Sequence, residues 1–249
     1  MRYFIEIAYK GTDFHGWQKQ PNASSIQDEI QQALKKVFSE EIEIIGAGRT
    51  DAGVHAKQIF AHFDYEQKIK ETEISYKVNS IIPKTIFIKR IFKVSNDAHA
   101  RFDAIQRSYE YHIHLTQNPF LLVTTWQIHN REFDVLKMNQ AASILSKYTN
   151  FKAFSKSKTD VKTYNCTITH AQWIQKENQL VFYITANRFL RNMVRAIVGT
   201  LLEVGEGKLS VDAFEKIILS QNRSNAGLSV PAQGLFLTEV AYPKNIYKN

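Results

Sequence analysis

Residues 107–115 read RSYEYHIHL, and apolar and polar side chains alternate along this stretch. Alternation with a period of two is typical of a β-strand with one buried face. The two faces are formed by Tyr109, Tyr111, Ile113 and Leu115 on one side and by Ser108, Glu110, His112 and His114 on the other. The stretch therefore predicts a strand, and we place the start of the second half of the chain near it.

On both sides of this stretch, strand and helix patterns alternate. Downstream, the patterns predict helices over 134–148, 191–205 and 211–221, and strands over 163–175, 179–187 and 235–242. Upstream, they predict strands over 2–9, 41–45, 58–65 and 86–94, and helices over 24–38 and 73–82. Ser24 or Ser25 can cap the first of these helices, and Pro83 stops the second.

Neither half shows the regular strand–helix repeat of a parallel α/β fold. The pattern predicts an α+β architecture with two similar subdomains, residues 1–104 and 105–249, whose antiparallel sheets could join. The length of 249 residues suits one large domain or two smaller ones of about 100–150 residues each.

Composition narrows the class of protein. The net charge of +8 favours a polyanionic partner, most often a nucleic acid, although an ordinary basic protein remains an equal alternative. Cys166 is the only cysteine, which excludes disulfide scaffolds and cysteine-based zinc sites. No window approaches the ~18 apolar residues of a membrane span, and the N-terminus lacks a secretory pattern, so we expect a cytoplasmic protein.

Residues 46–56 read GAGRTDAGVHA, which suggests a backbone that approaches something closely. A phosphate loop of the Walker type needs Lys and then Ser or Thr after its second glycine, but Val54 and His55 follow Gly53. A dinucleotide-binding loop needs a third glycine where Asp51 stands. A metal site is disfavoured because no acidic cluster accompanies His55 and His62, for which hydrogen-bonding roles are the simpler interpretation.

The remaining interpretation is a carboxylate presented to a substrate. Small residues surround Asp51, and Arg49 and His55 add positive character, so this carboxylate is a candidate nucleophile or general base. The alternative is an aspartate that caps a turn through its side chain. The stretch alone leaves the two interpretations open.

The predicted helix 191–205 is apolar on nearly all sides and is therefore expected to be buried. Arg195 lies within it and would need an anion in a partly dry setting, such as an internal carboxylate or a phosphate. An arginine whose head reaches the surface is the alternative.

Five stretches together resemble the TruA family of tRNA pseudouridine synthases. They stand in the family's order and run from near residue 9 to near residue 243: FHGWQKQ, GAGRTDAGVHA, ARFDAIQRSYEYHI, NRFLRNMVRAIVG and PAQGLFLTEVAYP. The run GLSVPAQG departs from the Thr-Ala-Pro type of run that many members have before the last strand.

The resemblance implies the pseudouridine synthase fold, with two ferredoxin-like subdomains and largely antiparallel sheets around a central cleft. It implies an isomerase without cofactor or metal, which converts uridine to pseudouridine in the anticodon stem-loop of tRNA at positions 38, 39 and 40 in tRNA nomenclature. It also implies a homodimer. A non-catalytic RNA-binding or chaperone protein on the same scaffold is the alternative function.

The resemblance also implies the roles of five residues. Asp51 is the catalytic aspartate, Arg195 the basic residue that pairs with it, and Tyr109 the tyrosine that packs on the uracil and can accept the C5 proton. Leu235 lines the uracil pocket, and Arg49 helps to displace or replace the flipped base.

Overall fold

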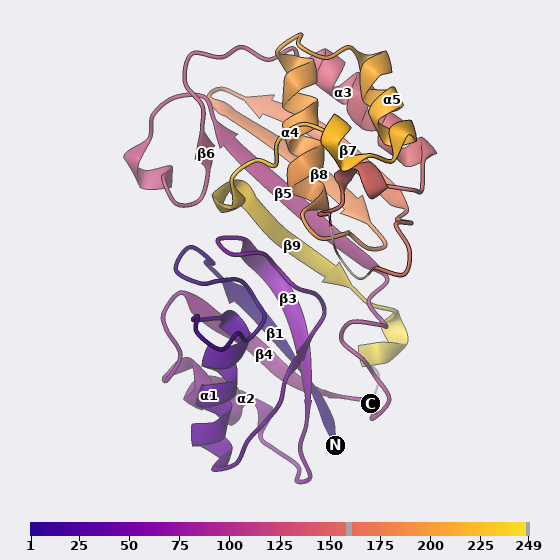
Figure 1. The fold of residues 1–249 in the computed structure, drawn as a ribbon. Coiled ribbons are helices and arrows are strands. Elements are labelled where there is room, and N and C mark those ends of the chain that lie inside the picture. Colours follow the sequence, from indigo (N-terminus) through magenta and orange to yellow (C-terminus); the bar gives the residue numbers. More distant parts are fainter. Residues whose placement is uncertain (158–160, 248–249) are drawn as a thin grey trace. The chain divides into compact units, whose positions relative to one another are not determined.

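The protein is described by a computed structural model that covers residues 1–157 and 161–247. The chain forms two compact units (Figure 1). The first contains residues 1–106 and the segment from Phe236 onward, and the second contains Arg107–Leu235. We expected a subdomain boundary between residues 104 and 105. The chain passes from the first unit to the second close to this position, between Gln106 and Arg107, but the segment from Phe236 onward belongs to the first unit.

Five strands build the sheet of the first unit. Their order is β4-β1-β3-β9, and β2 pairs with β3. The strands are β1 (Arg2–Tyr9), β2 (Ile45–Gly46), β3 (His55–Asp64), β4 (Ile86–Val94) and β9 (Leu235–Ala241). The pairs that β1 forms with β3 and β4 are antiparallel, whereas β9 is parallel to β3.

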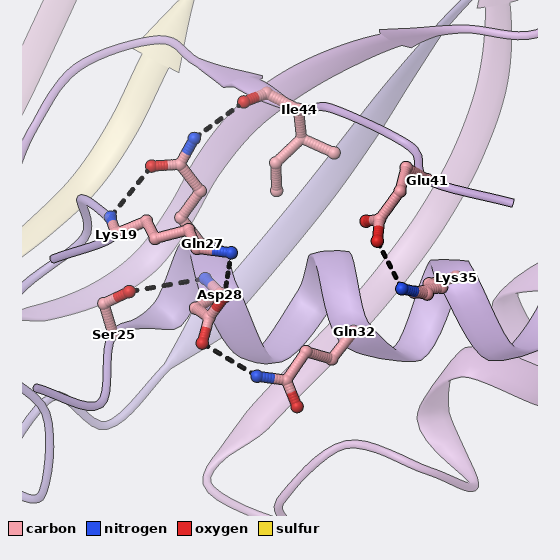
Figure 2. Close-up of polar contacts among 8 residues, drawn as sticks. All are labelled: Lys19, Ser25, Gln27, Asp28, Gln32, Lys35, Glu41 and Ile44. Atoms are coloured by element: carbon pink, nitrogen blue, oxygen red, sulfur yellow. Dashed lines mark hydrogen bonds and ion pairs between the residues drawn. The ribbon is translucent and has the colours of Figure 1, made fainter. Parts of the chain in front are cut away.

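Helices α1 (Ile26–Phe38) and α2 (Glu71–Asn79) complete the first unit, and α2 packs on β4. Ser25 is the N-cap of α1, because its hydroxyl accepts a hydrogen bond from the Asp28 amide at 3.3 Å (Figure 2). The predicted helix over 73–82 begins two residues earlier and ends three residues earlier than expected.

The expected strand over 41–45 is wrong for most of its length, since only Ile45 continues into β2. Ile42 and Ile44 are buried, so the alternating pattern is real. In place of a strand partner, the Gln27 side chain of α1 donates to the Ile44 carbonyl at 2.9 Å and accepts from the Lys19 amide at 3.0 Å, as Figure 2 shows. A helix side chain therefore takes the position of a neighbouring strand.

The sheet of the second unit has the order β5-β8-β7, with antiparallel pairs throughout this order. Its strands are β5 (Gln106–His114), β7 (Ile168–Lys176) and β8 (Gln179–Ala186), and the two-residue β6 (Trp126–Gln127) adds to β5 in parallel. The strands predicted over 107–115 and 179–187 are confirmed, and the strand predicted over 163–175 begins five residues later than expected, at Ile168. The patterns did not predict β6.

Three helices form a layer over this second sheet (Figure 1): α3 (Val135–Ile144), α4 (Met193–Gly205) and α5 (Val211–Ser220). Helix α3 packs on β7 and contacts α4 and α5. Helix α4 is buried on nearly all sides, as its sequence predicts. Its buried hydroxyl group, that of Thr200, donates to the Ala196 carbonyl at 2.8 Å and accepts from the Gly227 amide at 2.9 Å.

Short 3₁₀ helices connect these elements, at Pro119–Leu121, Leu145–Lys147, Lys152–Phe154, Arg223–Asn225, Ala232–Gly234 and Lys244–Tyr247. The α+β fold class with largely antiparallel sheets is confirmed. None of the helices in the described part of the chain is long and apolar enough to cross a membrane.

Candidate active site

The loop that carries Asp51 connects β2 to β3 in the first unit, and Trp17 fixes its beginning. A Cβ atom added to Gly46 would lie 2.6 Å from Nε1 of Trp17, whose side chain is 2% exposed. The Trp17 amide donates to the Thr50 carbonyl at 3.2 Å, and the hydroxyl groups of Thr50 and Tyr9 lie 2.8 Å apart. The residue directly before Asp51 is therefore held through its backbone and its side chain.

Asp51 begins a tight turn. Its carbonyl accepts a hydrogen bond from the Val54 amide at 3.2 Å, and Gly53, the third residue of the turn, has a φ of +78°. This left-handed conformation favours glycine at that position. The Asp51 side chain is half-buried and that of Arg49 is exposed.

The glycines of this loop have different roles. Gly46 accommodates the Trp17 ring and Gly53 permits the turn, whereas a Cβ atom on Gly48 would have no other atom within 4 Å. Gly48 is therefore the glycine of these three that has open space beside it, and the other two serve packing and backbone geometry.

Both histidines near this loop make hydrogen bonds within the protein. Nδ1 of buried His55 accepts from the Gly11 amide at 3.0 Å, and its ring stacks on Phe236 with 4.6 Å between ring centroids. Nδ1 of buried His62 accepts from the Ala100 amide at 3.2 Å. Burial, followed by the charge of Arg2, lowers the pKa of His62 to about 4, so this ring is neutral near neutral pH.

These contacts favour the hydrogen-bonding interpretation of the two histidines over a metal site. Among the residues that the structure describes, no group of three or more His, Cys, Asp or Glu side chains is arranged to hold a metal ion.

The other three candidate residues lie in the second unit. Tyr109 is half-buried on β5 and meets Phe189 edge-to-face, with 5.1 Å between ring centroids and 85° between ring planes. Leu235 is buried at the start of β9.

Arg195 lies on α4 and is half-buried. Its Nε donates to the Val230 carbonyl at 2.7 Å, and its own carbonyl accepts from the Val230 amide at 3.2 Å. The side chain is thus neither fully exposed nor fully buried, and one of its acceptors is a main-chain oxygen.

Arg195 and β5 together anchor the segment that leads to Leu235. The buried Tyr111 donates its hydroxyl to the Pro231 carbonyl at 2.8 Å, one residue after the carbonyl that Arg195 binds. A Cβ atom on Gly234 would lie 2.8 Å from the His112 carbonyl, so the chain passes directly over β5 before Leu235.

Sequence reasoning missed the supporting residues Tyr9, Trp17 and Thr50. A signal for Trp17 was present, since FHGWQKQ belongs to the motif series, but only the structure reveals its contact with Gly46.

A family model described as tRNA pseudouridine synthase matches residues 6–103 and 148–243. The chain therefore belongs to the tRNA pseudouridine synthase family, whose enzymes are isomerases. The matched segments contain Arg49, Asp51, Arg195 and Leu235, whereas Tyr109 lies between them.

Similar proteins extend along the whole chain. The chain is 52% identical over 249 residues to tRNA pseudouridine synthase A of Bacteroides fragilis, which covers 99% of this chain and 98% of the relative. It is 47% identical over 253 residues to the protein of the same name from Porphyromonas gingivalis, with 99% of both chains covered. The identity is 42% over 238 residues for the one from Acetivibrio thermocellus, with 95% and 97% covered.

Proposed function

We propose that this protein converts uridine to pseudouridine in the anticodon stem-loop of tRNA, at positions 38, 39 and 40, with Asp51 as the reacting carboxylate. One observation carries the proposal. In a chain of this family, Asp51 begins a turn whose backbone is fixed on both sides, and the residue three positions earlier, Gly48, has open space where a side chain would be.

The reaction needs a group that acts at the sugar carbon C1′. The bond between N1 and C1′ breaks, the uracil turns, and C5 bonds to C1′; the C5 proton is lost and N1 gains one. Asp51 either attacks C1′ or removes a proton from C2′, and both routes use its ionised carboxylate. The isomerisation balances without a redox partner or an energy source, so no cofactor is required.

A uridine in a stem-loop must leave its stack before a protein can reach C1′. We propose that Tyr109 packs on the displaced uracil and accepts the C5 proton, that Leu235 supplies an apolar wall, and that Arg49 replaces the flipped base. The contact with Phe189 supports this role for Tyr109, because it holds the ring in one orientation.

Arg195 is proposed as the counter-ion of Asp51. A guanidinium is always charged and its planar fork suits a carboxylate, and the bond from Nε to the Val230 carbonyl holds this side chain in place. A double-mutant cycle with Asp51→Asn and Arg195→Gln tests this pairing. The cycle is measured in the unfolding free energy, since Asp51→Asn is expected to be inactive, and a coupling free energy near zero would contradict the pairing.

The test of the function is direct. Purified protein is incubated with a tRNA transcript, and pseudouridine is mapped along the RNA. We expect pseudouridine at positions 38 to 40 with the wild type and none with Asp51→Asn, which still binds the tRNA. A wild type that binds tRNA without forming pseudouridine would support a non-catalytic RNA-binding protein instead.

We also propose a homodimer, on the basis of the family resemblance alone. Light scattering of the purified protein at several concentrations tests it, and a monomer of 28.8 kDa at all of them would contradict it.

A further inference from the structure

Gln27, in the first turn of α1, binds the main chain of two separate loops. Its Nε2 donates to the Ile44 carbonyl at 2.9 Å, and its Oε1 accepts from the Lys19 amide at 3.0 Å (Figure 2). Its own amide donates to the Trp17 carbonyl at 3.0 Å. We call residues 14–20 the supporting loop. Gln27 thus joins this loop to the stretch of chain that leads into β2.

Neighbouring side chains on α1 make contacts of another kind. Asp28 forms an ion pair with the Lys19 ammonium at 2.7 Å and accepts from the side chain of exposed Gln32 at 2.8 Å (Figure 2). These are contacts between partly exposed side chains, which contribute little to stability. Both groups of the Gln27 side chain bind main-chain atoms instead, so they restrict the backbone of the loops.

The supporting loop lies directly against the turn that Asp51 begins. Gly16 has a φ of +94°, and a Cβ atom on it would lie 2.5 Å from the Thr50 carbonyl oxygen and 3.1 Å from the carbonyl carbon of Asp51. The Phe14 carbonyl accepts from the Gly53 amide at 3.3 Å. The supporting loop therefore contacts the main chain on both sides of Asp51, and its own position depends on the helix behind it.

The second loop that Gln27 binds is the entry to the Asp51 loop. Ile44 is 1% exposed and directly precedes β2, whose second residue is Gly46. Strand β2 has two residues and pairs with β3 alone, so few ladder hydrogen bonds fix it. The bond from Gln27 to the Ile44 carbonyl adds a fixed point immediately before the strand.

Given the proposed function, we infer that Gln27 is a positioning residue for the reaction. It holds the entry to the Asp51 loop and the supporting loop beside the turn, so that the carboxylate meets C1′ or C2′ of the uridine in the productive geometry. Gln27 acts through these loops and does not touch the nucleotide. A displacement of about 1 Å at a reacting group can slow a reaction about 100-fold.

Two substitutions test this inference. Gln27→Met keeps the length of the side chain and removes both of its hydrogen bonds. Gln27→Glu keeps the acceptor for the Lys19 amide but, once ionised, removes the donor to the Ile44 carbonyl. The rate of pseudouridine formation is measured in a single turnover, well below the melting temperature of each variant. We expect it to fall about 10- to 100-fold in Gln27→Met and to fall also in Gln27→Glu, with the dissociation constant for tRNA changed less than about twofold.

Amide hydrogen exchange reports on the loop itself. In the wild type, the Ala47, Gly53 and Val54 amides donate to main-chain carbonyls. Peptides that cover residues 45–54 should exchange faster in Gln27→Met than in the wild type. This measurement does not depend on activity.

Two variants of the same helix serve as controls. Gln32→Met makes the same chemical change at an exposed position. Ser25→Ala removes the N-cap bond to the Asp28 amide and lowers the stability of α1, but it leaves the bonds of Gln27 in place. Both controls are expected to keep the single-turnover rate within about twofold of the wild type.

Wild-type rates in both Gln27 variants would overturn the inference, and so would an equal loss of rate in Ser25→Ala. Weaker tRNA binding by Gln27→Met at an unchanged rate would also overturn it, because the side chain would then act on binding and not on the reacting carboxylate. Pseudouridine mapping with the wild type separates the two proposals. An active wild type with unaffected Gln27 variants disproves the positioning role alone, and an inactive wild type disproves the proposed function.

Discussion

The two glycines at the start of the Asp51 loop allow one chemical change to be compared at neighbouring sites. Gly46→Ala adds a methyl carbon 2.6 Å from Cε2 and Nε1 of Trp17 and 2.7 Å from Cζ2. Because that indole is 2% exposed, it cannot move aside without disturbing the core. Overpacking of this kind costs about 1–3 kcal/mol of unfolding free energy.

For a chain of this size, a loss of about 1 kcal/mol of unfolding free energy lowers the melting temperature by about 2–4 °C. Gly46→Ala should therefore lower the melting temperature by about 2–12 °C. Pseudouridine formation should fall as well, because the methyl group pushes on the loop that ends at Asp51. Gly48→Ala is the matched control for stability. Its methyl group would have no other atom within 4 Å, so its unfolding free energy should change by less than about 1 kcal/mol.

Thermal unfolding, followed by tryptophan fluorescence, measures the change in stability. Pseudouridine formation below the melting temperature measures the change in activity. We expect Gly48→Ala to lose activity without losing stability, since its methyl group would occupy the space that we assign to the nucleotide. Equal melting temperatures for the two variants, or a lower one for Gly48→Ala, would refute the packing argument.

Three further changes test other parts of the structure. Asp51→Asn should abolish pseudouridine formation and change the affinity for tRNA less than twofold; measurable turnover would remove this residue from the mechanism. The pKa of His62 is lowered to about 4 by burial, so between pH 6.5 and 4 the unfolded chain binds a proton that the native chain does not. The unfolding free energy should therefore fall by up to about 3 kcal/mol as the pH decreases through this window, and urea unfolding should show a smaller fall for His62→Asn but not for a change at exposed His170. Tyr111→Phe removes the hydroxyl that donates to the Pro231 carbonyl and should cost about 1 kcal/mol, which an unchanged urea midpoint would contradict.

The sequence predicted most strands and helices because their patterns are long and their ends are marked. The strands at 2–9 and 86–94 have the expected bounds, and Ser25 is one of the two caps expected for α1. The strand predicted over 41–45 was wrong although Ile42 and Ile44 are buried. An alternating pattern indicates that one face of a stretch is buried, but it does not indicate which element buries it. Here the Ile44 carbonyl is bound by the Gln27 side chain of α1 and not by a strand.

The same limit explains the last strand. Its pattern predicted β9 correctly, but nothing in 235–242 indicates a parallel pair with β3 through His55 and Phe236. Once this pair forms, the Gln58 side chain accepts from the Val240 amide at 3.1 Å and Tyr242 donates its hydroxyl to the Ala100 carbonyl. The end of the chain then belongs to the first unit, which a division by sequence position alone could not represent.

Arg195 shows where physical reasoning about a candidate site reaches its limit. The apolar surroundings of α4 require an acceptor for a guanidinium, and this requirement follows from the sequence. It does not distinguish a carboxylate from a carbonyl, because both satisfy an N–H donor. The Val230 carbonyl meets part of the requirement and, with Tyr111, anchors the segment before Leu235. Removing the Arg195 side chain would therefore disturb this segment as well as any pairing with Asp51, and only the coupling in the double-mutant cycle separates the two effects.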